Sequence, residues 1–379
     1  MDMERLKLSK GIQTFETLRT EGFVYVDKTK YLVDLIDQGG TYFLARPRRF
    51  GKSLTVSTFE ALFSGRKDLF EGLHAEEFLS RPGFQPSPVI LLDMSKVITN
   101  RGIIEIENTI AKQVRNIANE LNVALPDSHL PGSLLDDLIM RTAKQYNQKV
   151  VILVDEYDKP YTDFVNATEM AENVRIALRN FYTQIKANDR YIRFVFLTGI
   201  SKFARLGVFS TLNNLDDISM MPEYAGICGY SEEEIIQYFP DYLEDTASEM
   251  QISTDELIGR MRHYYNGFSF DRNAIARFYN PFSTLLFFAH KTFSNFWFQT
   301  GATKFIVDFL KDKNLTVEQF RNFWVSYNFL NNPGDMDVTS PAGFLYQNGY
   351  LTVRTGIIDE LSLDYPNTEV LNSMSELLA

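Results

Sequence analysis

A glycine, a lysine and a serine stand together at Gly51-Lys52-Ser53, inside the segment YFLARPRRFGKSLT. The pattern predicts a strand before this tripeptide and a helix after it, which is the setting of a phosphate-binding loop. The first turn of a helix offers free backbone N–H groups and a positive dipole end to an anion. In that role Gly51 lets the backbone approach the phosphates, Lys52 reaches the β- and γ-phosphates, and the Ser53 hydroxyl binds Mg²⁺.

The match to the usual form of this loop, G-x-x-x-x-G-K-[ST], is incomplete at its first position. Arg46 stands there in place of glycine, and Pro47 follows it. By itself, the tripeptide is also typical of a surface turn that opens a helix, but the flanking strand and helix favour phosphate binding. Three arginines of the loop form a basic cluster suited to phosphate or to a nucleic-acid backbone. The predicted ATP-contacting residues are Arg46, Pro47, Arg48, Arg49, Phe50, Gly51, Lys52, Ser53 and Leu54.

A second element with suitable chemistry is the segment KVVILVDEYD, from Lys149 to Asp158. Its apolar run predicts a strand buried on both faces, with Asp155 at the carboxyl end, where ligands bind in open α/β sheets. Asp155 is predicted to hold Mg²⁺ together with Ser53, and Glu156 to polarise the attacking water. Two acids at a strand end that face solvent are the common alternative. The adjoining glutamate favours hydrolysis over phosphoryl transfer to a metabolite.

The next predicted strand ends in Thr198-Gly199-Ile200-Ser201. Thr198 is the candidate γ-phosphate sensor, and β-propensity alone explains a threonine there equally well. Lys202 and Arg205 follow, and either could supply charge to the transition state, in the same chain or to a neighbouring subunit, with a solvated surface charge as the alternative. Arg205 is the one taken into the catalytic set. The predicted catalytic set is therefore Lys52, Glu156, Thr198 and Arg205.

The elements that must position these residues are short apolar runs that alternate with helical patterns, which favours a parallel α/β sheet. The predicted strands are Thr41 to Ala45, Pro88 to Leu92, Val150 to Val154, Tyr191 to Leu197 and, as a fifth, Tyr224 to Cys228. After Gly229 the chain reads as helices, which begin with a capping box at Ser231 and Glu234. The expected domains are a P-loop core over 1–229, a helical lid over 230–300 and a C-terminal region over 301–379.

Composition limits the classes of protein that remain. The chain has 379 residues, a formal net charge of −11 and one cysteine, Cys228, which excludes an intramolecular disulfide. The acidic balance argues against coating nucleic acid by charge alone. Four histidines without metal-ligand spacing argue against a zinc site. No apolar run approaches the ~18 residues of a membrane span, so we expect a cytoplasmic protein with no membrane partner.

Several segments together resemble the AAA-ATPase-like family of gut bacteria and some archaea. They include YVDKT, ARPRRFGKS, LVDEYDKP, LTGISKF, YNGFSFD and LYQNGYLTV, and the resemblance covers about Thr14 to Val370. It implies an AAA-like P-loop NTPase core of the additional-strand, catalytic-glutamate type, followed by a helical lid and a small winged-helix-like region. Family members usually continue into a PD-(D/E)XK nuclease domain, which we expect to be absent from this chain.

The resulting hypothesis is an ATPase switch or motor that uses ATP and Mg²⁺ and drives or gates DNA processing or defence. The resemblance also implies DNA and further copies of the chain as candidate partners. Two alternatives remain open at this point: a nucleotide-gated module that binds DNA or a partner without hydrolysis, and a P-loop kinase.

Overall fold

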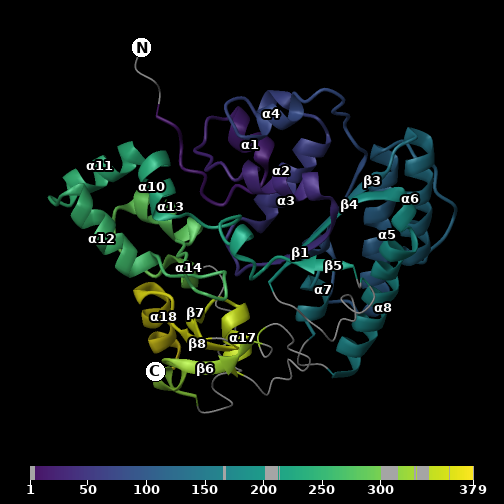
Figure 1. Cartoon of the computed structure of the whole chain (residues 1–379). Coiled ribbons are helices and arrows are strands. Elements are labelled where there is room, and N and C mark those ends of the chain that lie inside the picture. The colour runs from purple at the N-terminus through teal and green to yellow at the C-terminus, as the bar shows by residue number, and fades with distance from the viewer. Residues whose placement is uncertain are drawn as a thin grey trace. The chain divides into compact units, whose positions relative to one another are not determined.

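The computed structural model describes residues 5–164, 168–200, 212, 214–299, 315–327, 330, 341–357 and 359–378. The chain divides into two compact units. The first, here called the sheet unit, comprises Thr29–Ala45 and Thr55–Ile218. The second, here called the mixed unit, comprises Met1–Lys28, Arg46–Leu54 and Ser219–Ala379. Each unit is described by itself, and Figure 1 labels the elements of both.

A parallel five-stranded sheet forms the centre of the sheet unit, with the strand order β2-β3-β4-β1-β5. The strands are β1 (Gly40–Ala45), β2 (Val89–Asp93), β3 (Val150–Asp155), β4 (Ile192–Gly199) and β5 (Leu215–Asp217). All six residues of β3 are buried, as its uninterrupted run of β-branched and leucine residues predicts for a central strand. In this order β4 lies between the strand before the phosphate loop and the strand that ends in Asp155. One strand between these two is the order expected for the additional-strand, catalytic-glutamate type of P-loop NTPase.

Helices accompany the sheet, and α5, α6 and α8 pack on one another beside β2 and β3 (Figure 1). The amphipathic patterns of α5 and α6 bury leucine, isoleucine and valine at three- and four-residue steps. The helices of this unit are α2 (Thr29–Gln38), α3 (Lys52–Phe63, which begins in the loop), α4 (Ala75–Leu79), α5 (Ile103–Glu120), α6 (Pro131–Tyr146), α7 (Lys159–Thr162) and α8 (Thr168–Ala187), with short 3₁₀ turns at Lys67–Leu69, Met94–Lys96 and Asp189–Tyr191.

The mixed unit combines helices with a small antiparallel sheet of order β6-β8-β7. An aromatic-rich core joins α10 to α14, with Phe239, Tyr265 and Phe287 fully buried at its centre. The elements are α1 (Phe15–Thr20), η5 (Pro222–Tyr224), α10 (Glu232–Tyr238), α11 (Pro240–Glu249), α12 (Thr254–Tyr265), α13 (Pro281–His290), α14 (Phe296–Gln299), η6 (Val317–Phe320), β6 (Phe323–Ser326), α17 (Pro341–Gln347), β7 (Thr352–Ile357), β8 (Glu360–Asp364) and α18 (Thr368–Leu378).

The structure confirms four of the five predicted strands and corrects the fifth. Tyr224 to Cys228 is not a strand, because Tyr224 ends the 3₁₀ turn η5 and the following residues form turns. The fifth strand is β5, whose sequence LDD lacks the apolar run that would predict a strand. The capping box at the start of α10 is confirmed, with Ser231 and Glu234 bonded reciprocally. Across the described ranges, no helix is both long and apolar enough to cross a bilayer.

Candidate functional site

The carboxyl edge of the parallel sheet gathers the polar strand ends of the sheet unit. Asp155 ends β3 and pairs in register with Asp93, which ends β2. Thr198 stands one residue before the end of β4, in register with Leu44 of β1. Because the strands run parallel, these ends share one edge. The phosphate loop leaves the sheet unit at the same edge, since its first residue is bonded to Ala45, the last residue of β1.

The acidic turn, defined here as Asp155–Asp158, has an unusual backbone at the predicted catalytic residue. Glu156 has a φ of 50°, in the left-handed region that non-glycine residues seldom adopt. Its N–H donates to the Asp155 carboxylate at 3.0 Å. A left-handed residue costs about 1 kcal/mol or more, so surrounding contacts must hold it there. Such strain is a frequent mark of functional positions.

Those contacts come from β4. The Tyr157 N–H donates to the Thr198 carbonyl at 3.0 Å, and the Ile200 N–H donates to the Asp158 carboxylate at 3.3 Å. Asp158 and Tyr157 are almost completely buried. Gly199 completes the contact, because a β-carbon there would lie only 2.6 Å from the Tyr157 ring and 2.7 Å from Asp158 Oδ1. The acidic turn is therefore pinned to the end of the neighbouring strand.

The Thr198 side chain is buried, with no exposed surface. Its hydroxyl has no hydrogen-bond partner among the residues that the structure describes. A buried hydroxyl without a partner costs free energy, and such groups are often found where a ligand or water completes the bonding. This observation favours the predicted sensor role over β-propensity alone.

The phosphate loop, Arg46–Leu54, turns sharply before α3. Arg49 has a φ of 67° and Gly51 a φ of 99°, and both values lie in the left-handed range. A β-carbon at Gly51 would meet nothing within 4 Å, so the backbone conformation, not space, requires glycine there. Lys52 begins α3, and its ammonium donates to the carbonyls of Arg46 at 2.9 Å and Pro47 at 3.0 Å. The lysine therefore reaches back across the loop.

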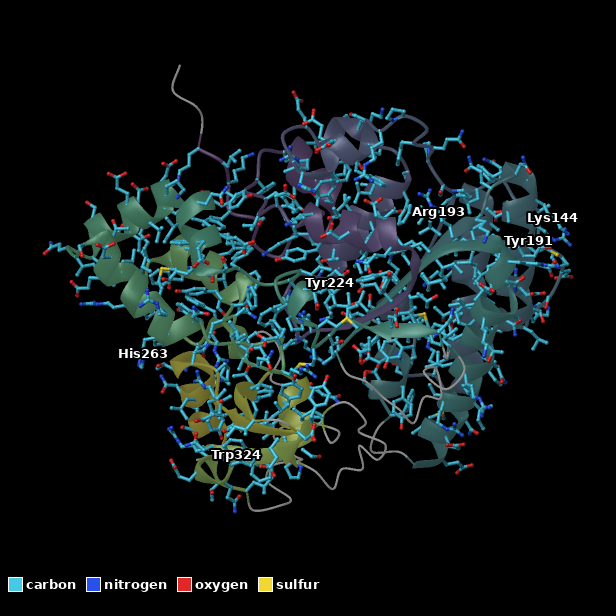
Figure 2. The ribbon with its side chains drawn as sticks, in the orientation of Figure 1. Lys144, Tyr191, Arg193, Tyr224, His263 and Trp324 are labelled. Carbon is cyan, nitrogen blue, oxygen red and sulfur yellow. The ribbon has the colours of Figure 1, made fainter. Side chains whose placement is uncertain are left out.

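Arg46, the residue in place of the usual first glycine, anchors the loop within the mixed unit. It is 1% exposed, and its guanidinium donates to the carbonyls of Ser219 at 2.8 Å and Tyr224 at 3.0 Å. Tyr224 is labelled in Figure 2. The guanidinium carbon also lies 4.2 Å from the centre of the Phe270 ring, in a cation–π contact. Arg46 therefore has a structural role, in fixing the start of the loop. Its contact with a nucleotide stays a prediction.

Other loop residues are held by aromatic side chains and a glycine far along the sequence. Phe50 is buried edge-on against Phe268 and Phe270. The Trp297 indole N–H donates to the Arg48 carbonyl at 3.3 Å. A β-carbon at Gly349 would lie 2.6 Å from the Pro47 side chain. The loop therefore depends on close packing from α14 and from the turn after α17.

Two carboxylates of the acidic edge were missed by the sequence reasoning. Asp93 ends β2 beside Asp155, and the shared ending of the segments VILLD and VILVD was the available signal. Asp158 accepts a hydrogen bond from the Ile200 N–H, and no spacing in the sequence indicates that bond. Of the predicted residues, Asp155, Glu156 and Thr198 come together in the sheet unit. The loop residues belong to the mixed unit, and Arg205 and Lys202 lie outside the described residues.

The donors present fit a magnesium ion carried with a nucleotide. Mg²⁺ prefers oxygen ligands and commonly takes one or two carboxylates, with substrate phosphates and waters completing its shell. Asp155 supplies a buried carboxylate, and Asp93 stands beside it. Over the described residues there is no group of three His, Cys, Asp or Glu side chains that could hold a metal without a substrate.

Comparisons with known proteins match the segments that carry this site. A model of the AAA-ATPase-like family, described as predicted AAA-ATPase, matches residues 9–209. A protein of Azotobacter chroococcum mcd 1, described as an uncharacterized protein in the vnfD 5' region, is 36% identical over 381 residues, which span 99% of this chain and 70% of that protein.

Among solved structures, the similarity is remote. Cdc6p from Pyrobaculum aerophilum aligns at 11% identity and a TM-score of 0.27, over 96% of both chains. The ORC2 protein of Aeropyrum pernix, in ADPNP–ADP complexes, aligns at 12% identity and a TM-score of 0.33, over 93% of this chain and 91% of that one. Scores this low carry no functional inference. The family match rests on the sequence, covers more than half of the chain and includes both the phosphate loop and the acidic turn, so the chain belongs to the AAA-ATPase-like family.

Proposed function

We propose that the chain binds ATP and hydrolyses it with Mg²⁺. The observation that carries the proposal is the strand order β2-β3-β4-β1-β5, which brings Asp155, Glu156 and Thr198 to the edge where the loop leaves β1. Family membership supports nucleotide binding by the same two segments. Hydrolysis in place of binding alone is inferred from Glu156, a carboxylate beside the metal-binding aspartate.

The roles follow from the chemistry of phosphoryl transfer, in which positioning and charge neutralisation dominate. Lys52 and the N–H groups at the start of α3 would bind the β- and γ-phosphates. Ser53 and Asp155 would hold Mg²⁺, which when bound neutralises charge on the phosphate oxygens. Glu156 would accept a hydrogen bond from the attacking water and orient it. Thr198 would donate its hydroxyl to the γ-phosphate.

The test is the ATPase activity of the purified chain beside two variants. Glu156→Gln should keep ATP binding and lower turnover by roughly a thousandfold, within the range for loss of a general base. Lys52→Ala should weaken binding itself. Glu169→Gln, at an exposed position of α8, is the matched control and should leave both unchanged. Turnover of Glu156→Gln at the parental rate would show that another group orients the water.

A role in DNA processing or defence, with further copies of the chain supplying a basic residue such as Arg205, extends this proposal. The alternative function is a nucleotide-gated module that binds DNA or a partner without turnover. The two functions are distinguished by measuring the binding of a DNA duplex over a range of salt concentrations, with and without ATP. ATP-dependent DNA binding without any hydrolysis by the parental chain would favour the alternative.

A further inference from the structure

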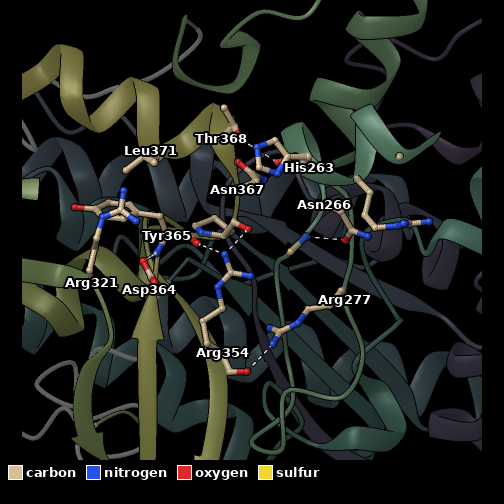
Figure 3. A pocket seen from close by; sticks show the side chains of 14 residues that line it. His263, Asn266, Arg277, Arg321, Arg354, Asp364, Tyr365, Asn367, Thr368 and Leu371 are labelled. Carbon is tan, nitrogen blue, oxygen red and sulfur yellow. Dashed lines mark hydrogen bonds between the residues drawn. The ribbon is translucent and has the colours of Figure 1, made fainter. Parts of the chain in front are cut away.

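A cavity of about 470 Å³ lies within the mixed unit, between the end of α12 and the start of α18 (Figure 3). The loop between α12 and α13, the residue after η6, β7 and the end of β8 complete its wall. The volume falls within the roughly 300–1,000 Å³ of small-molecule sites. None of the loop residues Arg46–Leu54 contributes to it, so it is a separate feature from the proposed ATP site.

The wall of this cavity is strongly basic. Among the described residues that line it, four are arginines and a single one, Asp364, is acidic. The arginines are Arg262, Arg277, Arg321 and Arg354. His263, labelled in Figures 2 and 3, adds a further nitrogen-bearing side chain. A concave surface of one sign concentrates ions of the opposite sign, so the cavity favours an anion even though the whole chain is acidic.

Two of these arginines already have carboxylate partners. Arg262 forms a bidentate salt bridge with Glu232, with N···O distances of 2.6 and 2.8 Å. Arg321 lies 3.4 Å from a Glu318 oxygen. Both arginine side chains are largely exposed, and surface pairs of this kind contribute little. They leave the inner part of the cavity to the other two arginines.

Arg277 and Arg354 are held by backbone carbonyls instead of carboxylates. Arg277 donates to the carbonyls of Val353 at 2.5 Å and Arg354 at 2.6 Å, and Arg354 donates to those of Tyr365 at 2.5 Å and Pro366 at 3.0 Å (Figure 3). Within the described part of the chain, neither forms a salt bridge. Burial lowers the pKa of both guanidinium groups, and the nearby Arg354 lowers that of Arg277 further. Asp271 acts in the opposite direction on the pKa of Arg277, and Asp364 on that of Arg354, but neither carboxylate forms a salt bridge with these arginines in the described residues. Two adjacent charges are thus oriented by backbone carbonyls.

The segment beside them, Pro366 and Asn367, is closely packed. Asn367 is 7% exposed, caps α18 by accepting from the Val370 N–H at 3.0 Å, and leaves its side-chain nitrogen without a hydrogen-bond partner in the described residues. Gly267 approaches so closely that a β-carbon there would lie 2.0 Å from the Pro366 carbonyl oxygen. The wall therefore combines oriented cations with a closely packed turn.

We propose that this cavity binds the phosphoryl group of a small phosphorylated molecule, with Arg277 and Arg354 as its principal ligands. Guanidinium groups present several N–H donors in a planar fork, which matches the oxygens of a phosphate better than a lysine does. Each of the two arginines retains donors beyond those bonded to the carbonyls. A volume of about 470 Å³ matches a small molecule better than a polymer as the source of the phosphoryl group.

The test uses calorimetric titration of inorganic pyrophosphate into the full chain carrying Lys52→Ala, so that the phosphate loop does not compete. Arg277→Gln or Arg354→Gln in this background should weaken binding by roughly tenfold to a hundredfold, as expected for loss of a charge-assisted bond. Arg260→Gln is the matched control, because Arg260 lies on α12 outside the cavity lining and, among the described residues, pairs with Glu256. It should bind pyrophosphate as tightly as the background chain.

Because Arg354 also holds the Tyr365 carbonyl, thermal unfolding of each variant accompanies the titration. Arg321→Gln leaves those carbonyl bonds intact but removes one positive charge from the cavity wall, so it should still weaken binding severalfold through the local field. The proposal is overturned by the absence of binding at millimolar pyrophosphate, or by equal affinities in the cavity variants and Arg260→Gln. A second titration with a single-stranded oligonucleotide decides whether the bound phosphoryl group belongs to a small molecule or to nucleic acid. Binding of DNA, but not pyrophosphate, that depends on Arg277 and Arg354 would replace the small molecule by nucleic acid.

Discussion

The acidic turn and the phosphate loop carry the two halves of the proposed ATP chemistry, and they are stabilised in different ways. The acidic turn is held by bonds to Thr198 near the end of β4 and to Ile200 directly after it. The loop is held by residues much farther away: the carbonyl partners of Arg46 lie 173 and 178 positions along the chain, and Trp297 lies 249 positions from Arg48. The turn therefore depends on sheet register, and the loop on the fold of the mixed unit.

The largest effect is expected from removing the loop's anchor. Arg46→Met deletes two charge-assisted hydrogen bonds and leaves the Ser219 and Tyr224 carbonyls buried without that partner, which should cost about 4 kcal/mol of unfolding free energy. ATP affinity should fall with it. Arg260→Met, at an exposed pair, should cost less than about 1 kcal/mol. Urea denaturation measures both, and equal midpoints would show that the guanidinium does not anchor the loop.

The next effect depends on pH and also reaches the loop through α14. Glu369 is buried, accepts from the Trp297 N–H at 2.9 Å and the Ser283 hydroxyl at 3.0 Å, and burial raises its pKa from 4.5 to about 8. The unfolded chain therefore loses this proton at lower pH than the folded chain, so stability falls as pH rises from about 4.5 to about 8.

Glu369→Gln keeps the acceptor and removes the ionisation. It should raise stability at pH 8 by about 4 kcal/mol and flatten the dependence over this window. Glu376→Gln, at an exposed position of the same helix, is the control and should leave the slope unchanged. Thermal unfolding in steps of roughly one pH unit between pH 5 and pH 8 measures this dependence. If the slope persists in Glu369→Gln, the pH dependence of stability arises from another group.

A change of intermediate size addresses the acidic turn. Gly199→Ala places a methyl group against Tyr157 and Asp158, which should cost about 2 kcal/mol by overpacking and displace the turn. Turnover should fall more than ATP affinity, whereas Gly349→Ala, which presses on Pro47, should mainly weaken affinity. Gly259→Ala, in open space on α12, should be slightly stabilising. An equal loss of affinity in the first two variants would remove the distinction between turn and loop.

The smallest effect concerns strain at the predicted catalytic residue. Glu156→Gly relieves a left-handed φ of 50°, and should stabilise the fold by about 0.5–1 kcal/mol relative to Glu156→Ala. Both variants should lack ATPase activity, because both lack the carboxylate. Denaturation midpoints compare them, and a less stable glycine variant would mean that no strain is stored there.

The sequence predicted the sheet, the two functional segments and their order, because each is marked by a local pattern. The run VVILV indicates a buried strand, and GKS after a strand indicates a helix start that binds phosphate. It was wrong about the fifth strand, since Leu215–Asp217 has no apolar signal and pairs through its backbone. It also offered no indication of the bonds that Arg46 makes, because their acceptors are main-chain carbonyls.

Residue types and spacing alone determined that the chain carries a lysine, a serine and two acids suited to nucleotide chemistry, since those signals lie within short segments. The tertiary structure decided that β4 lies between β1 and β3, so that Thr198 stands beside Asp155 and Glu156. It also decided that Arg277 and Arg354 meet in one cavity. Both outcomes depend on hydrogen bonds and burial between segments far apart in the chain, which no local pattern specifies.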